Sequence, residues 1–324
     1  MNEKMIRKDL RRRFHPVGWS MLGYYLLLNI VALGVVFAAL IIQMVMIGLN
    51  EGMGAMESAA ETLDVSMSAL GWGHILAVLL GTGILLLWKK PSYFRREILA
   101  KGRPMTVGAF FGLLCVFLGV QLVTSILNST IEMILNLFDL TMLAALESAS
   151  GMSDCFSMFL YASLLAPITE ELLFRGLILR SLMPYGKKFA VLCSAFLFGI
   201  YHGNLAQTPF AFLAGLVLGY VASEYNIIWA MVIHMVNNLV LADMLSRLTS
   251  FLPAGAADAI VGIVILLCGI GAAIILIVNH RKIGAYLRGD KINKLCLQAL
   301  FSHPGVIILA VLTFLSGLTL FSRL

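Results

Sequence analysis

Three groups of polar side chains interrupt the apolar stretches of this sequence, and their residue types suit hydrolysis of a peptide bond. In chain order, the groups are Glu170, Glu171 and Arg175, then Phe198 and His202, and finally His234 and Asn238. An ionisable group within a membrane span costs about 2.5 kcal/mol or more unless it is paired or hydrated. Each group is therefore a candidate functional site.

The first group combines two adjacent acids with one base. Glu171 and Arg175 are four residues apart, so on a helix they share one face in the favoured acid-before-base order. Glu170 points about 100° away and is not neutralised by the same base. Pro167 removes one backbone donor just before the acids. We interpret Glu171 and Arg175 as an ion pair, and Glu170 as a functional candidate that this pair leaves unneutralised. The alternative is a purely structural pair beside a protonated Glu170.

The other two groups place a histidine at helical spacing from a partner. Phe198 and His202 share one helix face, so the aromatic ring can cover one side of the imidazole. His234 and Asn238 share a face in the same way. Two polar side chains on one stripe of an apolar helix indicate a buried partner or a hydrated cavity. The alternative for this pair is that it only hydrogen-bonds neighbouring helices together.

The depths of these side chains predict that they meet. Counted from the basic loop at 187–188, Glu170 and His202 lie within about one helical turn of each other. His234 is only eight residues from the turn at 224–226 (234 − 226), so it would lie shallower if that turn were fully hydrated. We predict that the turn is drawn into the protein. The His234 nitrogens should then lie within about 10 Å of the Glu170 carboxylate.

A carboxylate, two histidines and an amide can hydrolyse a peptide bond through an activated water. The carboxylate would take a proton from the water while one histidine orients it. The other histidine and the amide would donate hydrogen bonds to the oxyanion of the tetrahedral intermediate. The sequence contains no HExxH, GxSxG, P-loop or GxGxxG motif.

The composition shows what kind of scaffold must position these groups. Hydrophobic residues make up 60% of the 324 residues and charged residues only 12%, against roughly 45–50% and about 25% in soluble domains. So few charges cannot cover a water-facing surface. The net charge of +6 could indicate nucleic-acid binding, but the Lys and Arg cluster at 4–13, 89–103, 180–188 and 281–294, and acids occupy 51–64 and 132–154 between them. This alternation is the positive-inside pattern. It predicts a multi-pass protein of the cell membrane with a cytoplasmic N-terminus and no nucleic-acid partner.

The expected fold class is therefore all-α, a polytopic membrane bundle of about eight to nine transmembrane helices. Apolar runs lie at 19–49, 71–88, 107–128, 155–183, 189–205, 208–223, 227–246, 259–279 and 304–322. The first run is long enough to tilt or to leave the bilayer. The segments 51–70 and 129–150 could be short interfacial helices. His15, His280 and His303 lie near membrane boundaries and are expected to be hydrated. We expect one membrane domain over 1–324, with a catalytic core at 155–245 flanked by helices in 1–150 and 250–324.

The three motifs EExxxR, FxxxH and HxxxN, in this order on separate spans, resemble the CAAX-protease and bacteriocin-processing family of intramembrane proteases. This family is also called CPBP, Abi or type II CAAX prenyl endopeptidase-like, and the resemblance covers about 155–245. It implies that Glu170 and His202 activate water and that His234 and Asn238 form the oxyanion hole, with Glu171, Arg175 and Phe198 in support. It also implies a membrane-embedded or lipidated peptide as substrate. The family has been labelled both metalloprotease and metal-free, and Glu170, His202 and His234 could supply three zinc ligands, so zinc is a possible cofactor. We favour the metal-free version, because His and Asn on one face suit oxyanion binding better than ligation.

Two other classes of function compete with proteolysis. A membrane scaffold or bacteriocin-immunity factor would not use the polar groups for chemistry. A transporter would use Glu170 and His202 as a proton relay. The sequence shows none of the paired broken helices in corresponding halves that many transporters have, so we regard transport as the weakest of the three.

Overall fold

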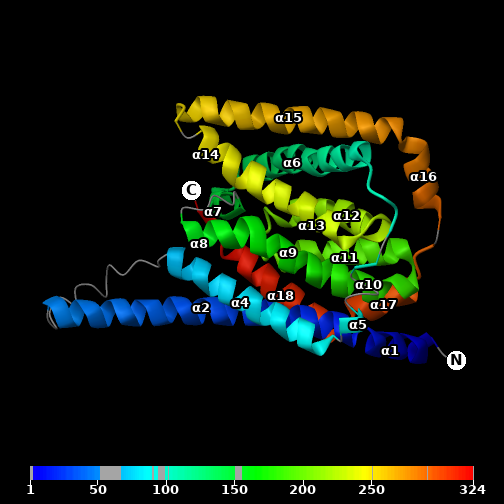
Figure 1. Ribbon diagram of the computed structural model, residues 1–324, viewed down its shortest axis with the longest axis horizontal. Coiled ribbons are helices and arrows are strands. Elements are labelled where there is room, and N and C mark those ends of the chain that lie inside the picture. Colours follow the sequence, from blue (N-terminus) through cyan, green and yellow to red (C-terminus); the bar gives the residue numbers. More distant parts are fainter. Residues whose placement is uncertain are drawn as a thin grey trace.

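The computed structural model describes residues 3–51, 67–89, 91–93, 99–100, 102–149, 155–249, 251–289 and 291–323, and it shows a bundle of helices (Figure 1). Among these residues, four helices are long and apolar enough to cross a membrane, or five if α17 and α18, bent by 63°, form one span. The four are α2 (His15–Glu51), α4 (Met67–Trp88), α6 (Val107–Asn136) and α15 (Ala254–Val278). The predicted all-α membrane bundle is confirmed. In lipid, a helix satisfies every backbone donor and acceptor within its own segment.

Shorter helices complete the bundle. They are α1 (Glu3–Arg13), α5 (Pro91–Tyr93), α7 (Leu143–Ala149), α11 (Lys187–Tyr201), α12 (Thr208–Glu224), α16 (His280–Arg288), α17 (Lys294–Phe301) and α18 (Pro304–Leu318). Two short strands, β1 (Leu140–Thr141) and β2 (Ser322–Arg323), pair in antiparallel fashion. The apolar runs did not predict α1, α16, α17 or the strand pair, because these elements are polar or only a few residues long.

The first and third long helices extend beyond the predicted apolar runs. α2 has 37 residues, which corresponds to about 55 Å at 1.5 Å per residue, well above the roughly 30 Å hydrocarbon core. It must therefore tilt or leave the bilayer, as predicted. α6 continues to Asn136, so residues 129–136 prolong a span. We had expected the segment 129–150 to form a short interfacial helix, and for residues 129–136 that expectation is wrong. In the other predicted interfacial segment, 51–70, residues 52–66 lie outside the described part of the chain.

Two predicted spans are broken into short pieces, and these two carry the acids and the third polar group. The first consists of α8 (Phe156–Phe159), η2 (Leu160–Leu165), α9 (Ala166–Glu171), η3 (Leu172–Leu179), α10 (Arg180–Leu182) and η4 (Met183–Tyr185). The second consists of α13 (Ile227–Val236), η5 (Asn237–Met244) and α14 (Leu245–Thr249). The segments η2, η3 and η5 are π-helical, a geometry that is rare and frequent at functional sites.

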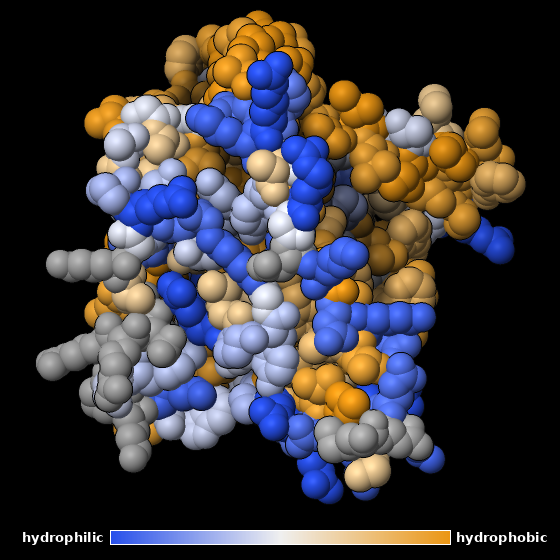
Figure 2. All heavy atoms as spheres, turned by 90° about the vertical axis from the view of Figure 1, so that its right-hand side faces the viewer, coloured by the Kyte–Doolittle hydropathy of each residue, from blue (hydrophilic) through white to orange (hydrophobic). Residues whose placement is uncertain are grey.

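The described basic segments meet at one end of the bundle, which we call the basic end. It is formed by α1, α16 and α17 and the turns before α11 and after α12, and Figure 2 shows the hydrophilic atoms gathered there. Lys187 forms an ion pair with Glu224, and the Arg103 guanidinium lies 3.6 Å from the same carboxylate. Lys188 donates to the Leu287 carbonyl at 2.9 Å. The grouping agrees with the positive-inside pattern. The basic residues Lys90, Arg95, Arg96 and Lys101 lie outside the described residues.

We propose that the basic end faces the cytoplasm, and cysteine labelling tests this. In a variant without native cysteines, Glu147→Cys on α7 lies at the opposite end from Lys282→Cys on α16 (Figure 1). A membrane-impermeant maleimide should label position 147 in intact cells and position 282 only after lysis. The reverse pattern would contradict the cytoplasmic N-terminus.

One boundary histidine is buried, contrary to our expectation. The His303 side chain is 0% exposed, and its Nε2 lies 2.9 Å from Nδ1 of His15. Gly305 N donates to His303 Nδ1 at 3.1 Å, so the imidazole caps α18. The burial results from close packing of α2 on α18, since a Cβ on Gly18 would lie 2.1 Å from this ring. A single sequence does not reveal such a long-range contact.

Candidate functional site

The first polar group lies on α9 and η3, and the structure gives its two acids different environments. Glu171 and Arg175 are both 0% exposed, and the guanidinium NH1 donates to Glu171 Oε1 at 2.8 Å. Arg175 NH2 also donates to the Gly215 carbonyl of α12 at 3.2 Å. The Glu170 side chain is 16% exposed. The predicted ion pair is present, and Glu170 is the acid that other molecules can reach.

His234 of α13 lies between the two acids. Its Nδ1 is 3.0 Å from Glu171 Oε1, and its Nε2 is 3.8 Å from Glu170 Oε2. Because a carboxylate only accepts hydrogen bonds, Nδ1 carries the hydrogen in the bond to Glu171. Nε2 is therefore the ring nitrogen directed at Glu170. The prediction that His234 lies within about 10 Å of the Glu170 carboxylate is confirmed.

Phe198 is the centre of the aromatic contacts around these groups. Its ring lies 4.7 Å from the His202 ring and 5.8 Å from the His234 ring. The Arg175 guanidinium lies 4.4 Å from the ring centroid, a cation–π distance. His202 Nδ1 lies 2.8 Å from the Phe198 carbonyl oxygen. A carbonyl only accepts hydrogen bonds, so Nδ1 is the donor and Nε2 takes no part in this bond. The structure thus brings the first two predicted groups and His234 together.

Asn238 has a contact that its sequence position did not predict. Its Nδ2 donates to the Ala162 carbonyl at 2.9 Å. In an α-helix this carbonyl would accept from the amide of Ala166, but that amide bonds to Tyr161 instead. The next residue is Pro167, which has no N–H to offer. Asn238 therefore satisfies a carbonyl that the π-helical turn and the proline leave without a backbone donor.

Two further polar residues belong to the same network. Asn237 donates to Asn238 Oδ1 at 3.0 Å and accepts from Gln121 of α6 at 3.5 Å. Asn237 is buried, although regular helical spacing would place it off the face that His234 and Asn238 share. The π-helical segment η5 begins at Asn237, and its wider turn changes which side chains share a face. Gln121 makes an interhelical bond, as expected for an isolated polar residue in a span.

The similar depth of Glu170 and His234 has a structural cause. Lys187 pairs with Glu224 at the end of α12, and Arg180 NH2 donates to the Ala222 carbonyl at 3.2 Å, so α12 ends alongside the segment that starts at residue 180. Counted from there, Glu170 is ten residues deep (180 − 170) and His234 is eight residues from 226, about 15 and 12 Å. The turn after α12 is also covered, because Arg103 N donates to the Glu224 carbonyl at 2.8 Å. The predicted burial of this turn is thus supported.

The side chains Glu170, His202 and His234 are of types that bind zinc. Within the described ranges, however, no group of three or more His, Cys, Asp and Glu side chains is arranged to hold a metal ion. The contact between Glu170 and His234 Nε2 is a pairwise approach at 3.8 Å. The observed arrangement therefore does not fit a zinc site, and we assign no step of the reaction to a metal.

The lack of a side chain at Gly215 lets α12 pack closely against Arg175 of the ion pair. A Cβ on this residue would lie 3.0 Å from Ala195 Cα and 3.3 Å from Arg175 NH2. We expect Gly215→Val to overpack this contact and to destabilise the fold by about 1–3 kcal/mol. The measurement is thermal unfolding in detergent, with Gly262→Val as the control because no atom of the described residues lies within 4 Å of a Cβ on Gly262. Equal melting temperatures for the two variants would contradict the predicted close packing.

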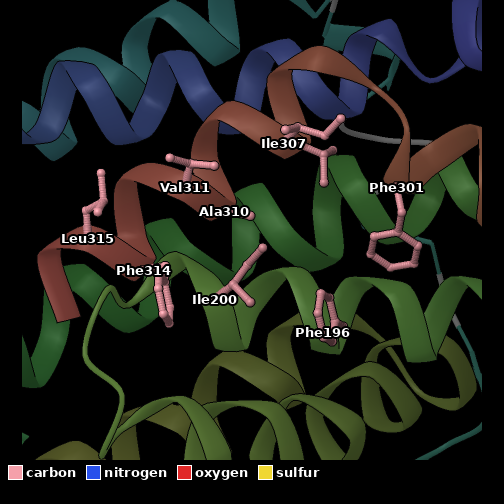
Figure 3. A pocket seen from close by; sticks show the side chains of 9 residues that line it. Phe196, Ile200, Phe301, Ile307, Ala310, Val311, Phe314 and Leu315 are labelled. Atoms are coloured by element: carbon pink, nitrogen blue, oxygen red, sulfur yellow. The ribbon is translucent and has the colours of Figure 1, made fainter. Parts of the chain in front are cut away.

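A separate cavity of about 400 Å³ lies between α11 and α18 (Figure 3). Phe196 and Ile200 point into it from α11, facing Ile307, Ala310, Val311, Phe314 and Leu315 of α18. Every lining side chain is apolar, so this cavity offers no group for acid–base chemistry. The candidate site is the polar cluster around Glu170 and His234.

The comparisons with known proteins agree with the three motifs. Residues 152–240 match the family model described as type II CAAX prenyl endopeptidase Rce1-like. No curated protein and no solved structure gave a match. The matched segment is 89 residues long (240 − 152 + 1) and contains all three polar groups. Over residues 152–240, this chain is therefore similar to the Rce1-like type II CAAX prenyl endopeptidases.

Proposed function

We propose that this protein is an intramembrane endopeptidase in which Glu170 activates the attacking water. The observation that carries the proposal is the position of His234 between the buried Glu171 carboxylate and the partly exposed Glu170 carboxylate. Three motifs distant in the sequence thereby form one cluster. The family match over 152–240 supports proteolysis as the activity.

The charges of the cluster balance when His234 is protonated. Glu170 and Glu171 contribute two negative charges, and Arg175 neutralises one of them through the 2.8 Å ion pair. A proton shared between Glu170 and His234 Nε2 neutralises the other. A buried cluster without net charge avoids most of the desolvation cost of an isolated carboxylate.

The reaction then follows from these positions. Glu170 takes a proton from water as the water oxygen attacks the scissile carbonyl carbon. His202 orients this water through the nitrogen that does not bond to Phe198. Protonated His234 donates from Nε2 to the oxyanion, and the second amide N–H of Asn238 is the other predicted donor. When the intermediate collapses, the C–N bond breaks and Glu170 returns its proton to the leaving amine. Arg175 and Phe198 hold the two histidines and Glu171 in place.

The test is cleavage by the purified, reconstituted protein. One substrate is a synthetic peptide with a prenylated cysteine near its C-terminus, and the second is the same peptide without the lipid. We expect cleavage of the lipidated peptide and the same rate with and without 1,10-phenanthroline, since no metal takes part in the proposed steps. Loss of activity with the chelator and its recovery with zinc would contradict the metal-free mechanism. A protein that cleaves neither peptide would favour the scaffold or immunity reading.

A further inference from the structure

Three side-chain amides, which we call the amide row, lead from α6 to the predicted oxyanion donor Asn238. Gln121 Nε2 donates to Asn237 Oδ1 at 3.5 Å, and Asn237 Nδ2 donates to Asn238 Oδ1 at 3.0 Å. Asn238 Nδ2 in turn donates to the Ala162 carbonyl at 2.9 Å. The three hydrogen bonds therefore run in one direction, from Gln121 to Ala162.

The Ala162 carbonyl sets the direction of the amide row. A carbonyl only accepts hydrogen bonds, so Asn238 must present its nitrogen to Ala162 and its oxygen to Asn237. Asn237 must then present its own nitrogen to Asn238 and its oxygen to Gln121. The carbonyl can accept from a side chain because the π-helical turn and Pro167 leave it without a backbone donor. The irregular backbone of the span that carries the acids therefore orients an amide 76 residues away in the sequence.

Hydrogen bonds at both ends fix the orientation of the Asn238 amide. The terminal torsion of an asparagine is broad, so an amide held only at its nitrogen can turn about that bond. Asn238 is held at its nitrogen by Ala162 and at its oxygen by Asn237. These two bonds also fix the direction of the second N–H, which is the one assigned to the oxyanion. Turning the amide by 180° would direct an oxygen lone pair there instead.

Helix α6 packs beside the segment that carries Asn237 (Figure 1). The Phe117 ring of α6 is 1% exposed and lies 6.4 Å from the His234 ring. Gln121 comes four residues later on the same face of α6 and bonds to Asn237, three residues after His234. Both contacts come from a helix outside the family-matched residues 152–240. A flanking helix thus supports the third polar group at two successive positions.

We propose that Asn237 and Gln121 are positioning residues that hold the Asn238 amide toward the oxyanion of the scissile carbonyl. The inference rests on the proposed endopeptidase function, with Asn238 as one of its oxyanion donors. Neither positioning residue contacts the substrate or takes a proton. Oxyanion donors act through preorganisation, so an amide that is free to rotate loses part of its effect on the rate. Asn237 acts directly on Asn238, and Gln121 acts through Asn237.

The variants that test this remove the amides but keep the shape of the side chains. Asn237→Leu and Gln121→Met replace polar atoms by apolar ones at similar volume. We expect Asn237→Leu to lower kcat on the lipidated peptide by about 10–100-fold with KM little changed, the size of effect measured for residues that orient metal ligands. Gln121→Met should lower kcat less, because its bond is longer at 3.5 Å. Each variant should also bind a phosphinate peptide, whose charged oxygens mimic the oxyanion, more weakly than the wild type does.

An Asn238→Ala background separates positioning from folding. Asn238→Ala alone should lower kcat by about 10²–10³-fold, the effect of losing one oxyanion donor. In that background Asn237→Leu should cause no further fall in kcat, because a positioning residue acts only through the group it holds. An equal fall in both backgrounds would assign Asn237 to folding and would overturn the inference. Wild-type kcat in Asn238→Ala would overturn the inference together with the oxyanion role of Asn238.

Asn128→Leu is the matched control for Gln121→Met. Asn128 also lies on α6 and makes an interhelical bond, from its Nδ2 to the Ala206 carbonyl at 3.0 Å. Its kcat should equal that of the wild type even if its melting temperature falls. If the wild type cleaves the peptide and the Asn237→Leu/Gln121→Met double variant keeps the wild-type kcat, this inference is wrong while the proposed function stands. A wild type that cleaves neither peptide overturns both.

Discussion

Glu170→Gln is expected to lower cleavage by about 10²–10⁴-fold while the protein folds normally. The amide has nearly the same size as the carboxyl group but cannot take a proton from water, and general-base catalysis contributes about this factor. Glu170 is partly exposed, and within the part of the chain that the structure describes it makes no ion pair shorter than the 3.8 Å approach to His234. Its carboxylate is therefore not required for packing. The measurement is kcat on the lipidated peptide together with the melting temperature in detergent.

The neighbouring acid provides the sharpest comparison for this prediction. Glu171→Gln removes a carboxylate that is 0% exposed and paired with Arg175 at 2.8 Å, so it should lower the melting temperature as well as the rate. Glu147→Gln, the same change at an exposed site on α7, should alter neither quantity. If Glu171→Gln were stable and inactive while Glu170→Gln kept its activity, the roles assigned to the two acids would be reversed.

Arg175→Ala is expected to destabilise the protein by about 3–5 kcal/mol, because it leaves the Glu171 carboxylate buried and unpaired. The Gly215 carbonyl also loses its donor, and the cation–π contact with Phe198 disappears. Folded yield and activity should both fall. Thermal unfolding and size-exclusion chromatography in detergent measure the first effect, and peptide cleavage measures the second.

An exposed pair with the same spacing isolates the effect of burial. Arg13 and Asp9 of α1 are also four residues apart and 2.9 Å from each other, but their side chains are 63% and 54% exposed. Arg13→Ala should leave the melting temperature unchanged within error, because water and salt screen such a pair. A double variant, Glu171→Leu with Arg175→Leu, should recover part of the stability lost in Arg175→Ala, since no buried charge is left unpaired. If Arg175→Ala were as stable as Arg13→Ala, the idea that burial gives the pair its strength would be wrong.

The features predicted correctly from the sequence are those governed by local spacing or by the bilayer. Glu171 and Arg175 pair because residues four apart on any helix are neighbours. The apolar runs become helices because lipid offers no other partner for backbone groups. Phe198 and His202 share a face for the same local reason.

Other features depend on segments that are distant in the chain and packed together only in the fold. His234 bonds to Glu171 across 63 residues, and Asn238 bonds to Ala162 across 76. The π-helical segments shifted side chains from the faces that regular 3.6-residue spacing assigns, which is why Asn237 and the Ala162 contact were missed. The burial of His303 required α2 to pack on α18. The sequence by itself thus determined which polar groups interrupt the apolar helices, because apolar runs and helical spacing are local properties. Only the tertiary structure decided which of their atoms face Glu170, because that depends on how separate helices pack.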